Sequence, residues 1–298
     1  MRRFRIAEGL DSALDRTRRL LFTPARGRVW LACGILAFLS VLFDYQTSWG
    51  WSIFGDRSNG DSWRSWLEHF QAHPLLYSGV GLLIFVGAFL WIIVTTWITS
   101  RGLLMFARAV LTQETEVEPL WHAVGPQADS LFMLRATVKI AGLVITAVVV
   151  ALAFLFIHVG IGRVSDSSVV VAVAMAPFAA VAGLAAFAVA LFESLTAQFV
   201  VPLMLLRGDS CSAAWRRFIE IARHNALGIL LFYLAHMVIV AVGGVAAVVV
   251  GIATLMLGFL PVIHHTLLAP LYVFDRALSL NLIEQAEGTH AQEVAELW

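Results

Sequence analysis

Apolar residues are grouped along the chain into six runs, each long enough or nearly long enough to form a membrane-crossing helix. A helix rises about 1.5 Å per residue, so about 20 residues cross a hydrocarbon core about 30 Å thick. The first run is short for a crossing, and prolines in the fourth and glycines in the fifth are expected to bend or trim those two. The pattern predicts an all-α, polytopic membrane protein with six transmembrane helices. The runs are Val29–Phe43, Leu75–Thr99, Leu131–Val159, Val169–Leu206, Ala226–Leu257 and Val262–Ile283.

Three segments outside these runs mix apolar and charged residues at helical spacing. They are residues 3–22, where Phe4, Ala7, Leu10, Leu14 and Leu21 recur, Gly102–Leu111, and Ser212–Asn225, which Asp209 or Ser210 could cap. Amphipathic helices that carry Trp, Phe and Arg commonly lie in the interface of anionic leaflets. The alternative is that they are connectors that cover the ends of membrane helices. Residues expected to contact lipid or a partner are Arg101, Arg108, Trp215, Arg216, Arg217 and Arg223.

Arginine placement predicts the orientation of the chain. Eight arginines precede or include Arg28, two follow the second run and four follow the fourth, whereas the opposite loops together hold three. The positive-inside rule then places both termini in the cytoplasm. The expected organisation is a cytoplasmic amphipathic helix at 1–27, a transmembrane domain at 28–284 and a cytoplasmic tail at 285–298. Within the domain, the loop 44–74 lies outside and the amphipathic segments 101–130 and 207–225 lie inside.

Composition agrees with a membrane protein and narrows the functions. Hydrophobic residues make up 60% of the chain and charged residues 13%, against about 45–50% and about 25% in soluble domains. A formal net charge of zero argues against a nucleic-acid partner. The two cysteines, Cys33 and Cys211, argue against a disulfide framework or a cysteine metal site. No phosphate-binding loop, dinucleotide motif or zinc-protease motif is present, so no cofactor is expected.

Glu193 stands out because it lies inside an apolar run, 14 residues before Arg207. That separation places it about 21 Å into the membrane if the helix is unbroken. A lone carboxylate at that depth costs several kcal/mol and should be neutral or paired. We expect a buried polar cluster, whose role is to clasp the helices, to line a proton or solute path, or neither if Glu193 faces a cytoplasmic vestibule. Its expected members are Glu193, Gln198, Arg276, Asp275 and Arg135.

Histidines offer a second candidate site. His69 and His73 are spaced i,i+4, which puts them on one helix face, and His264 and His265 are expected on the same outer side. Neutral imidazoles from the two segments could hold a zinc or copper ion. The alternative, solvated loop histidines, is the commoner case, so no metal is expected.

Several stretches carry a resemblance to a known family. They are "SRGLLMFARAVL", "VEPLW", "DSLFMLRATV", "FVVPLMLLRGDSCSAAWRRF" and "LPVIHHTLLAPLYVFDRALSL". Over residues 75–285 the chain resembles an uncharacterised bacterial family of multi-pass membrane proteins. It is distantly similar to the membrane domain of glycerophosphodiester phosphodiesterases. The resemblance implies a bacterial cytoplasmic (inner) membrane location and carries no activity, because the phosphodiesterase catalytic domain is absent.

Three classes of function remain open. The first is a non-enzymatic integral membrane protein, acting as a scaffold, an accessory subunit or a lipid-interacting factor, with anionic lipids and another membrane protein complex as partners. The second is a small-solute or lipid transporter that uses a buried Glu193 and Arg276 cluster. The third is an intramembrane enzyme, for which Ser194, next to Glu193, with His236 is a conceivable pair that no motif supports.

Overall fold

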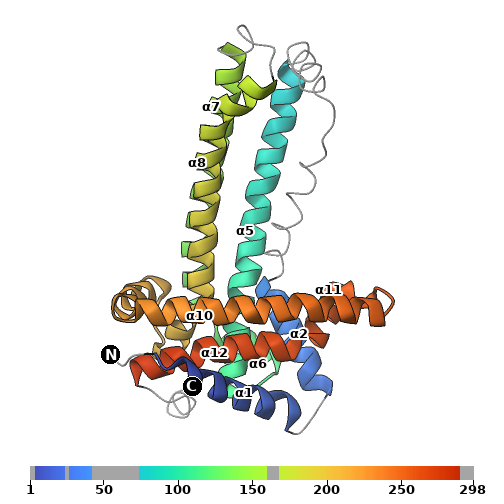
Figure 1. Cartoon of the computed structure of the whole chain (residues 1–298), viewed down its shortest axis with the longest axis vertical. Helices are drawn as coiled ribbons and strands as arrows, with labels where there is room; N and C mark the ends of the chain where they lie inside the picture. Colours follow the sequence, from blue (N-terminus) through green and yellow to red (C-terminus); the bar gives the residue numbers. More distant parts are fainter. Residues whose placement is uncertain (1–3, 24–26, 42–73, 160–167, 289–298) are drawn as a thin grey trace. The chain divides into compact units, whose positions relative to one another are not determined.

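The computed structural model describes residues 4–23, 27–41, 74–159 and 168–288, and these are almost entirely helical, with no strand among them. The predicted all-α fold is therefore confirmed. The loop predicted at 44–74 lies almost wholly outside the described residues. The elements are α1 (Ile6–Phe22), α2 (Gly27–Val41), α5 (Pro74–Thr112), α6 (Val117–Ala123), α7 (Gly125–Val159), α8 (Ser168–Leu195), the π-turn η2 (Thr196–Val200), α9 (Val201–Arg207), α10 (Cys211–Ala253), η3 (Leu257–Phe259), α11 (Pro261–Leu267) and α12 (Ala269–Glu287) (Figure 1).

Four helices are long and apolar enough to cross a membrane, namely α5, α7, α10 and the run formed by α8 with α9. A fifth crossing is counted if α11 and α12, which meet at a bend of 66°, are taken together. The remaining apolar helix, α2, has 15 residues. The chain thus has the makeup of a multi-pass membrane protein.

The chain divides into two compact units. Unit 2 comprises Phe43–Thr96 and Arg135–Glu193, and its described part holds the first half of α5, most of α7 and α8. Its apolar side chains are largely exposed, which is expected where lipid rather than protein surrounds a helix. The helices α7 and α8 are in contact, since the rings of Phe156 and Phe178 lie 5.6 Å apart.

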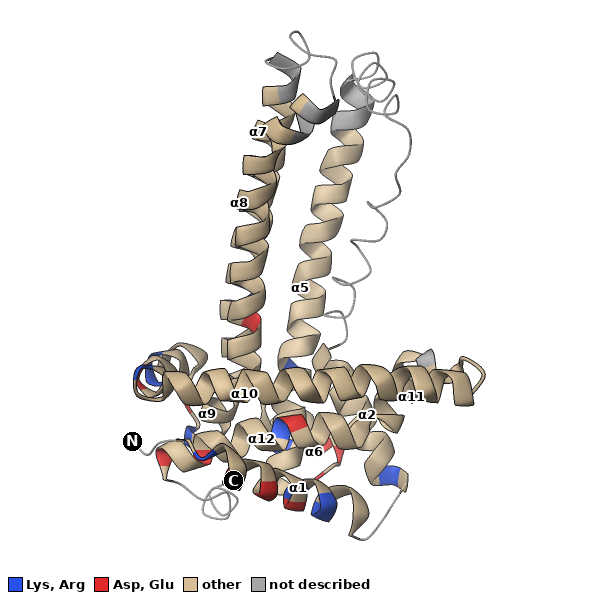
Figure 2. Ribbon diagram, viewed as in Figure 1, with Lys and Arg blue, Asp and Glu red and all other residues tan. Residues whose placement is uncertain are grey.

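Unit 1 comprises Met1–Leu42, Trp97–Leu134 and Ser194–Trp298, and α12 is its central helix. Helices α1, α2, α9 and α10 all pack against α12. Charged residues gather on α1, on α12 and at the start of α10, whereas the rest of α10 has no Lys, Arg, Asp or Glu (Figure 2). The side chains of α12 from Arg276 to Ile283 are all buried, so this helix is a core element of unit 1.

Glycines let the helices of unit 1 approach closely. A Cβ on Gly34 of α2 would lie 2.5 Å from the Cα of Thr266, and one on Gly102 would lie 2.5 Å from the carbonyl oxygen of Leu39. Contacts this short exclude any side chain, and small residues of this kind are the usual basis of close packing between membrane helices. Gly102 thereby fixes where α5 crosses α2.

The segment Gly102–Leu111 differs from its prediction. It is not a separate amphipathic helix but the end of α5, which continues without a break to Thr112. Its apolar residues from Leu103 to Leu111 are buried in the core of unit 1. A single Gly after Thr99 does not end a helix whose next residues can bury this much apolar surface.

The segment Ser212–Asn225 is helical and forms the first part of α10. Asn225 has non-helical backbone angles (φ −127°, ψ 28°), so the predicted boundary between this helix and the fifth apolar run coincides with a kink. Ser210 occupies the N-cap position. The predicted N-terminal helix is also present as α1, but its buried face comprises Gly9, Ala13, Thr17, Leu20 and Leu21, while Ala7 and Leu14 are exposed.

Candidate functional site

A π-turn at Thr196–Val200 breaks the fourth apolar run just before Pro202. The amide of Val201 donates to the carbonyl of Thr196, five residues back. The next bond of this kind would run from residue 202 to the carbonyl of Ala197, but proline has no N–H to donate. The π register and the proline together therefore leave the Ala197 carbonyl without a helical partner.

Arg276 fills this gap. Its Nη1 donates to the carbonyl oxygen of Ala197, and its guanidinium lies over the ring of Phe106, 5.9 Å from the centroid. The residue is only 6% exposed. An arginine this deeply buried is expected to satisfy backbone carbonyls or acids, because an unpaired charge there is costly. Turns with π geometry are often found at functional sites, so the surroundings of this one form our candidate site.

Asp275 links the π-turn to α10. Its Oδ2 accepts from Gln198 Nε2 at 2.9 Å, and its Oδ1 lies 2.6 Å from His236 Nδ1. A carboxylate can only accept, so Nδ1 carries the hydrogen. In a neutral imidazole the lone pair is then on Nε2, held in a fixed orientation by the carboxylate. Gln198, Asp275 and His236 thus form one hydrogen-bonded chain across three elements of unit 1.

Two polar atoms of this site lack a hydrogen-bond partner among the described residues: Oε1 of Gln198 and Nε of Arg276. One is an acceptor and the other a donor, and both are buried. Buried polar groups are nearly always paired, with water where protein offers nothing. The chemistry available here is proton exchange at His236 and hydrogen bonding to a small polar molecule.

Sequence reasoning left both His236 and Tyr233 out of the expected cluster. The hydroxyl of Tyr233 lies 3.0 Å from that of Ser194, which is two residues before the π-turn, and Tyr233 packs edge-on against His236. Tyr233 and His236 are three residues apart, so they share one face of α10. That spacing is the only sequence signal that could have joined them. Ser194 hydrogen-bonds Tyr233, and His236 hydrogen-bonds Asp275.

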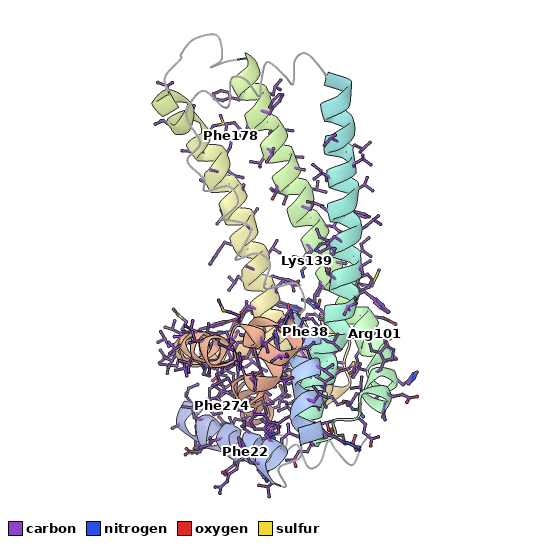
Figure 3. The ribbon with its side chains drawn as sticks, turned by 90° about the vertical axis from the view of Figure 1, so that its right-hand side faces the viewer. Phe22, Phe38, Arg101, Lys139, Phe178 and Phe274 are labelled. Carbon is purple, nitrogen blue, oxygen red and sulfur yellow. The ribbon has the colours of Figure 1, made fainter. Side chains whose placement is uncertain are left out.

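Glu193 belongs to a second group, in unit 2. Its Oε2 accepts from Nε of Arg135 at 2.7 Å and from Nη2 of the same arginine. Nζ of Lys139, on α7 (Figure 3), lies 3.5 Å from the same oxygen. Arg135 is 1% exposed. The five residues expected to form one cluster thus contribute to two groups: Arg135 with Glu193 in unit 2, and Gln198, Asp275 and Arg276 in unit 1.

The residues expected to contact lipid divide into two sets. Arg216 and Arg223 are exposed on α10. Arg217 donates to Glu287 and Glu220, and Trp215 packs partly against the core.

Arg101 lies between the indoles of Trp97 and Trp121, 4.9 and 4.6 Å from their centroids, and pairs with Asp129 at 3.4 Å (Figure 3). Arg108 is half-buried near the end of α5. The two arginines of α5 are therefore packed within unit 1 rather than presented on an amphipathic surface.

The histidine candidates are only partly described. His69 and His73 lie outside the described residues. His264 and His265 are buried in α11, which corrects the expectation that they are solvated loop residues. Nδ1 of His265 lies 2.6 Å from the Pro261 carbonyl, and its ring stacks on Tyr272 at 5.0 Å. Among the described residues, no group of three or more His, Cys, Asp or Glu side chains could hold a metal ion.

Comparison with known proteins places the chain among proteins without an assigned activity. A family model whose description is "Family of unknown function (DUF7544)" matches residues 5–285. No curated protein and no solved structure matches the chain. The expectation of an uncharacterised family is confirmed, and nothing in these comparisons supports the similarity to glycerophosphodiester phosphodiesterases.

Proposed function

We propose a function for this chain, which belongs to the DUF7544 family of unknown function, from the chemistry of its own helices. It is a non-enzymatic integral protein of the bacterial cytoplasmic membrane that acts as a scaffold, an accessory subunit or a lipid-interacting factor. Its cytoplasmic arginines engage anionic lipid headgroups, and its exposed apolar faces are covered by acyl chains.

The observation that carries this proposal is the change in exposed side chains along α10. Before the kink at Asn225, the exposed residues include Arg216 and Arg223. After it, Leu227 and Leu234 are among a long series of exposed aliphatic side chains. A helix that changes from exposed arginine to exposed leucine at a kink is suited to the boundary between headgroups and acyl chains.

Spacing supports this interpretation. Arg216 and Arg223 are seven residues apart, or about two helical turns, so they lie on the same side of α10. Each basic residue near an anionic leaflet contributes about 1 kcal/mol of attraction. Two such residues on one face therefore contribute about 2 kcal/mol, enough to select anionic from zwitterionic lipid.

The topology is part of the proposal. The four long helices, the bent pair and α2 together would supply the six crossings, with α2 the shortest at about 22 Å. Snorkelling ends and local thinning of the bilayer accommodate a helix of that length. The arginine distribution then places both termini in the cytoplasm.

The test compares charge reversals on two helices. In Arg216→Glu with Arg223→Glu, we expect the apparent affinity for phosphatidylglycerol, measured by native mass spectrometry, to fall at least about thirtyfold, because loss of the two attractions alone amounts to about 2 kcal/mol. Arg18→Glu with Arg19→Glu is the matched control for the change in charge, since both arginines are exposed on α1, which lacks the long series of exposed aliphatic side chains seen on α10. Equal losses in the two variants would contradict the proposal.

A transporter is the second candidate, supported by one observation. Ionisable groups, Arg135 with Glu193, are buried among apolar helices, where such groups usually serve a pathway or a clasp. Arg276, the partner first expected for Glu193, donates instead to a backbone carbonyl. Rapid modification of Glu193→Cys by a membrane-impermeant thiol reagent would favour the transporter, and protection of that cysteine would favour the clasp.

A further inference from the structure

The chain begins its described part with an extended arm, Phe4 and Arg5, which lies across α10 and α12 of unit 1. The amide of Phe4 donates to Oδ1 of Asn225 at 3.1 Å. Oε1 of Gln285 accepts from the amide of Arg5 at 2.9 Å, and Nε2 of the same residue donates to the Arg5 carbonyl at 3.4 Å. The side-chain amides of Asn225 and Gln285 therefore hydrogen-bond to the main chain of the arm.

The aromatic ring of the arm packs against a buried ring of unit 1. Phe4 is stacked on Phe199, with ring centroids 6.4 Å apart and planes 8° from parallel. Phe199 is itself fully buried, against Phe218 and Phe232. The arm thus adds one ring to an aromatic cluster that is otherwise internal to unit 1.

Gly228 makes room for that ring. A Cβ on Gly228 would lie 2.8 Å from Cδ2 and 2.9 Å from Cβ of Phe4, closer than any side chain permits. Glycine within a helix is unfavourable by about 1 kcal/mol relative to alanine, so its presence here is explained by the ring that crosses it. We call the site formed by Phe199, Asn225, Gly228 and Gln285 the arm groove.

Few contacts of the arm groove depend on which residues the arm contains. Its contacts are with main-chain groups of two residues and with one aromatic ring, while the Arg5 side chain points away and pairs with Glu8. Main-chain hydrogen bonds for affinity and a side-chain pocket for specificity are how proteins bind extended peptides in general. Any extended segment with an aromatic residue in the right place satisfies the same groups.

We infer that the arm groove is a docking site for an extended, aromatic-containing segment of a partner protein, and that Phe4 occupies it in cis when no partner is bound. The seated arm defines the chemistry of the occupant: an extended main chain, an aromatic side chain, and no requirement for the side chain that follows. This inference rests on the proposed function, because it specifies how a scaffold or accessory subunit would hold its partner.

A tethered segment competes strongly with a free one, since short tethers give effective concentrations in the millimolar range. A partner segment therefore binds only if its affinity is high enough to displace the arm, or if the arm is removed. Phe4→Ala vacates the ring position while leaving the rest of the chain intact, so it exposes the groove to a peptide in solution.

The probe is a labelled synthetic peptide with the sequence of residues 1–8, added to full-length protein in zwitterionic nanodiscs. By fluorescence anisotropy, Phe4→Ala should bind the peptide at least about tenfold more tightly than the unaltered chain. A peptide in which alanine replaces the phenylalanine, with the same charge, should not bind.

A second substitution tests whether the peptide binds in the arm groove. In the Phe4→Ala chain, Gly228→Leu should abolish binding by filling the ring position. Gly244→Leu should leave binding unchanged, because a Cβ on that glycine of the same helix meets nothing within 4 Å. Equal peptide binding by Phe4→Ala and the unaltered chain, or binding insensitive to Gly228→Leu, would overturn the inference. Neither result would touch the lipid measurement, so the two proposals fail separately.

Discussion

The ion pair between Arg135 and Glu193 gives a stability prediction whose size follows from its surroundings. Both side chains lie on apolar helices of unit 2, and they are 1% and 13% exposed. Glu193→Ala removes the carboxylate and leaves two cations, Arg135 and Lys139, within reach of the position it occupied. Removing one partner of a buried ion pair costs about 3–5 kcal/mol, because the other charge stays buried.

A smaller effect would be expected if the interaction behaved as a neutral hydrogen bond between membrane helices, which averages about 0.6 kcal/mol. The larger figure applies here, because the guanidinium of Arg135 does not lose its proton and stays charged. In domains of about 150–250 residues, 1 kcal/mol lowers the melting temperature by about 2–4 °C. We therefore expect the melting temperature of Glu193→Ala in mild detergent to fall by about 6–20 °C.

The control is Glu116→Ala, because Glu116 is exposed and makes no side-chain cap hydrogen bond. Its melting temperature should match that of the unaltered chain. Replacing both Arg135 and Glu193 by leucine should restore part of the loss, as apolar pairs often substitute for buried ion pairs. Melting temperatures of Glu193→Ala and Glu116→Ala within about 2 °C of each other would refute the reasoning.

Three further changes probe unit 1. The loss of unfolding free energy caused by Arg276→Met should be about 1–3 kcal/mol smaller in a Pro202→Ala chain than in the unaltered chain. The reason is that residue 202 then supplies an N–H for the Ala197 carbonyl of the π-turn. Strict additivity of the two melting-temperature changes would contradict this. Glu287→Gln should lower stability by only about 1 kcal/mol, although its carboxylate accepts from two arginines, because the side chains of Arg207 and Arg217 are 45% and 32% exposed to solvent; urea titration measures it. Asp275→Ala should move the two ring-nitrogen resonances of His236 in ¹⁵N spectra, because it removes the acceptor of the Nδ1 hydrogen, and unchanged resonances would show that the carboxylate does not hold the ring.

Hydrophobic patterning predicted the helices better than their ends. The apolar runs were recognisable because a membrane requires about 20 apolar residues for each crossing, whatever the neighbours are. The end of the second run was misjudged because Arg101 and Gly102 look like a helix end and a membrane edge. In the structure the helix continues to Thr112, since the guanidinium of Arg101 is held between two indoles.

The polar site was only partly predictable from the sequence, because its contacts join residues on different helices. Composition shows that Glu193 needs a partner but not which one, because the candidates are on other helices and tertiary packing decides among them. Arg135 is 58 residues from Glu193 in sequence, and His236 is 39 from Asp275. The π-turn had one local signal, Pro202, whose missing N–H leaves the Ala197 carbonyl to accept from Arg276.

The boundary at the kink of α10 is the central claim, and its depth in the membrane can be measured directly. Nitroxide labels are placed one at a time at Arg216, Arg223, Leu227, Leu234 and Val238, in a chain whose two native cysteines are replaced by alanine, in lipid nanodiscs. Power saturation then compares access of oxygen, which dissolves in acyl chains, with access of a water-soluble nickel complex. The account predicts that nickel dominates at the two arginine positions and oxygen at the three aliphatic ones, with the crossover beside the kink. Nickel access at Leu234 and Val238 equal to that at Arg216 would contradict it.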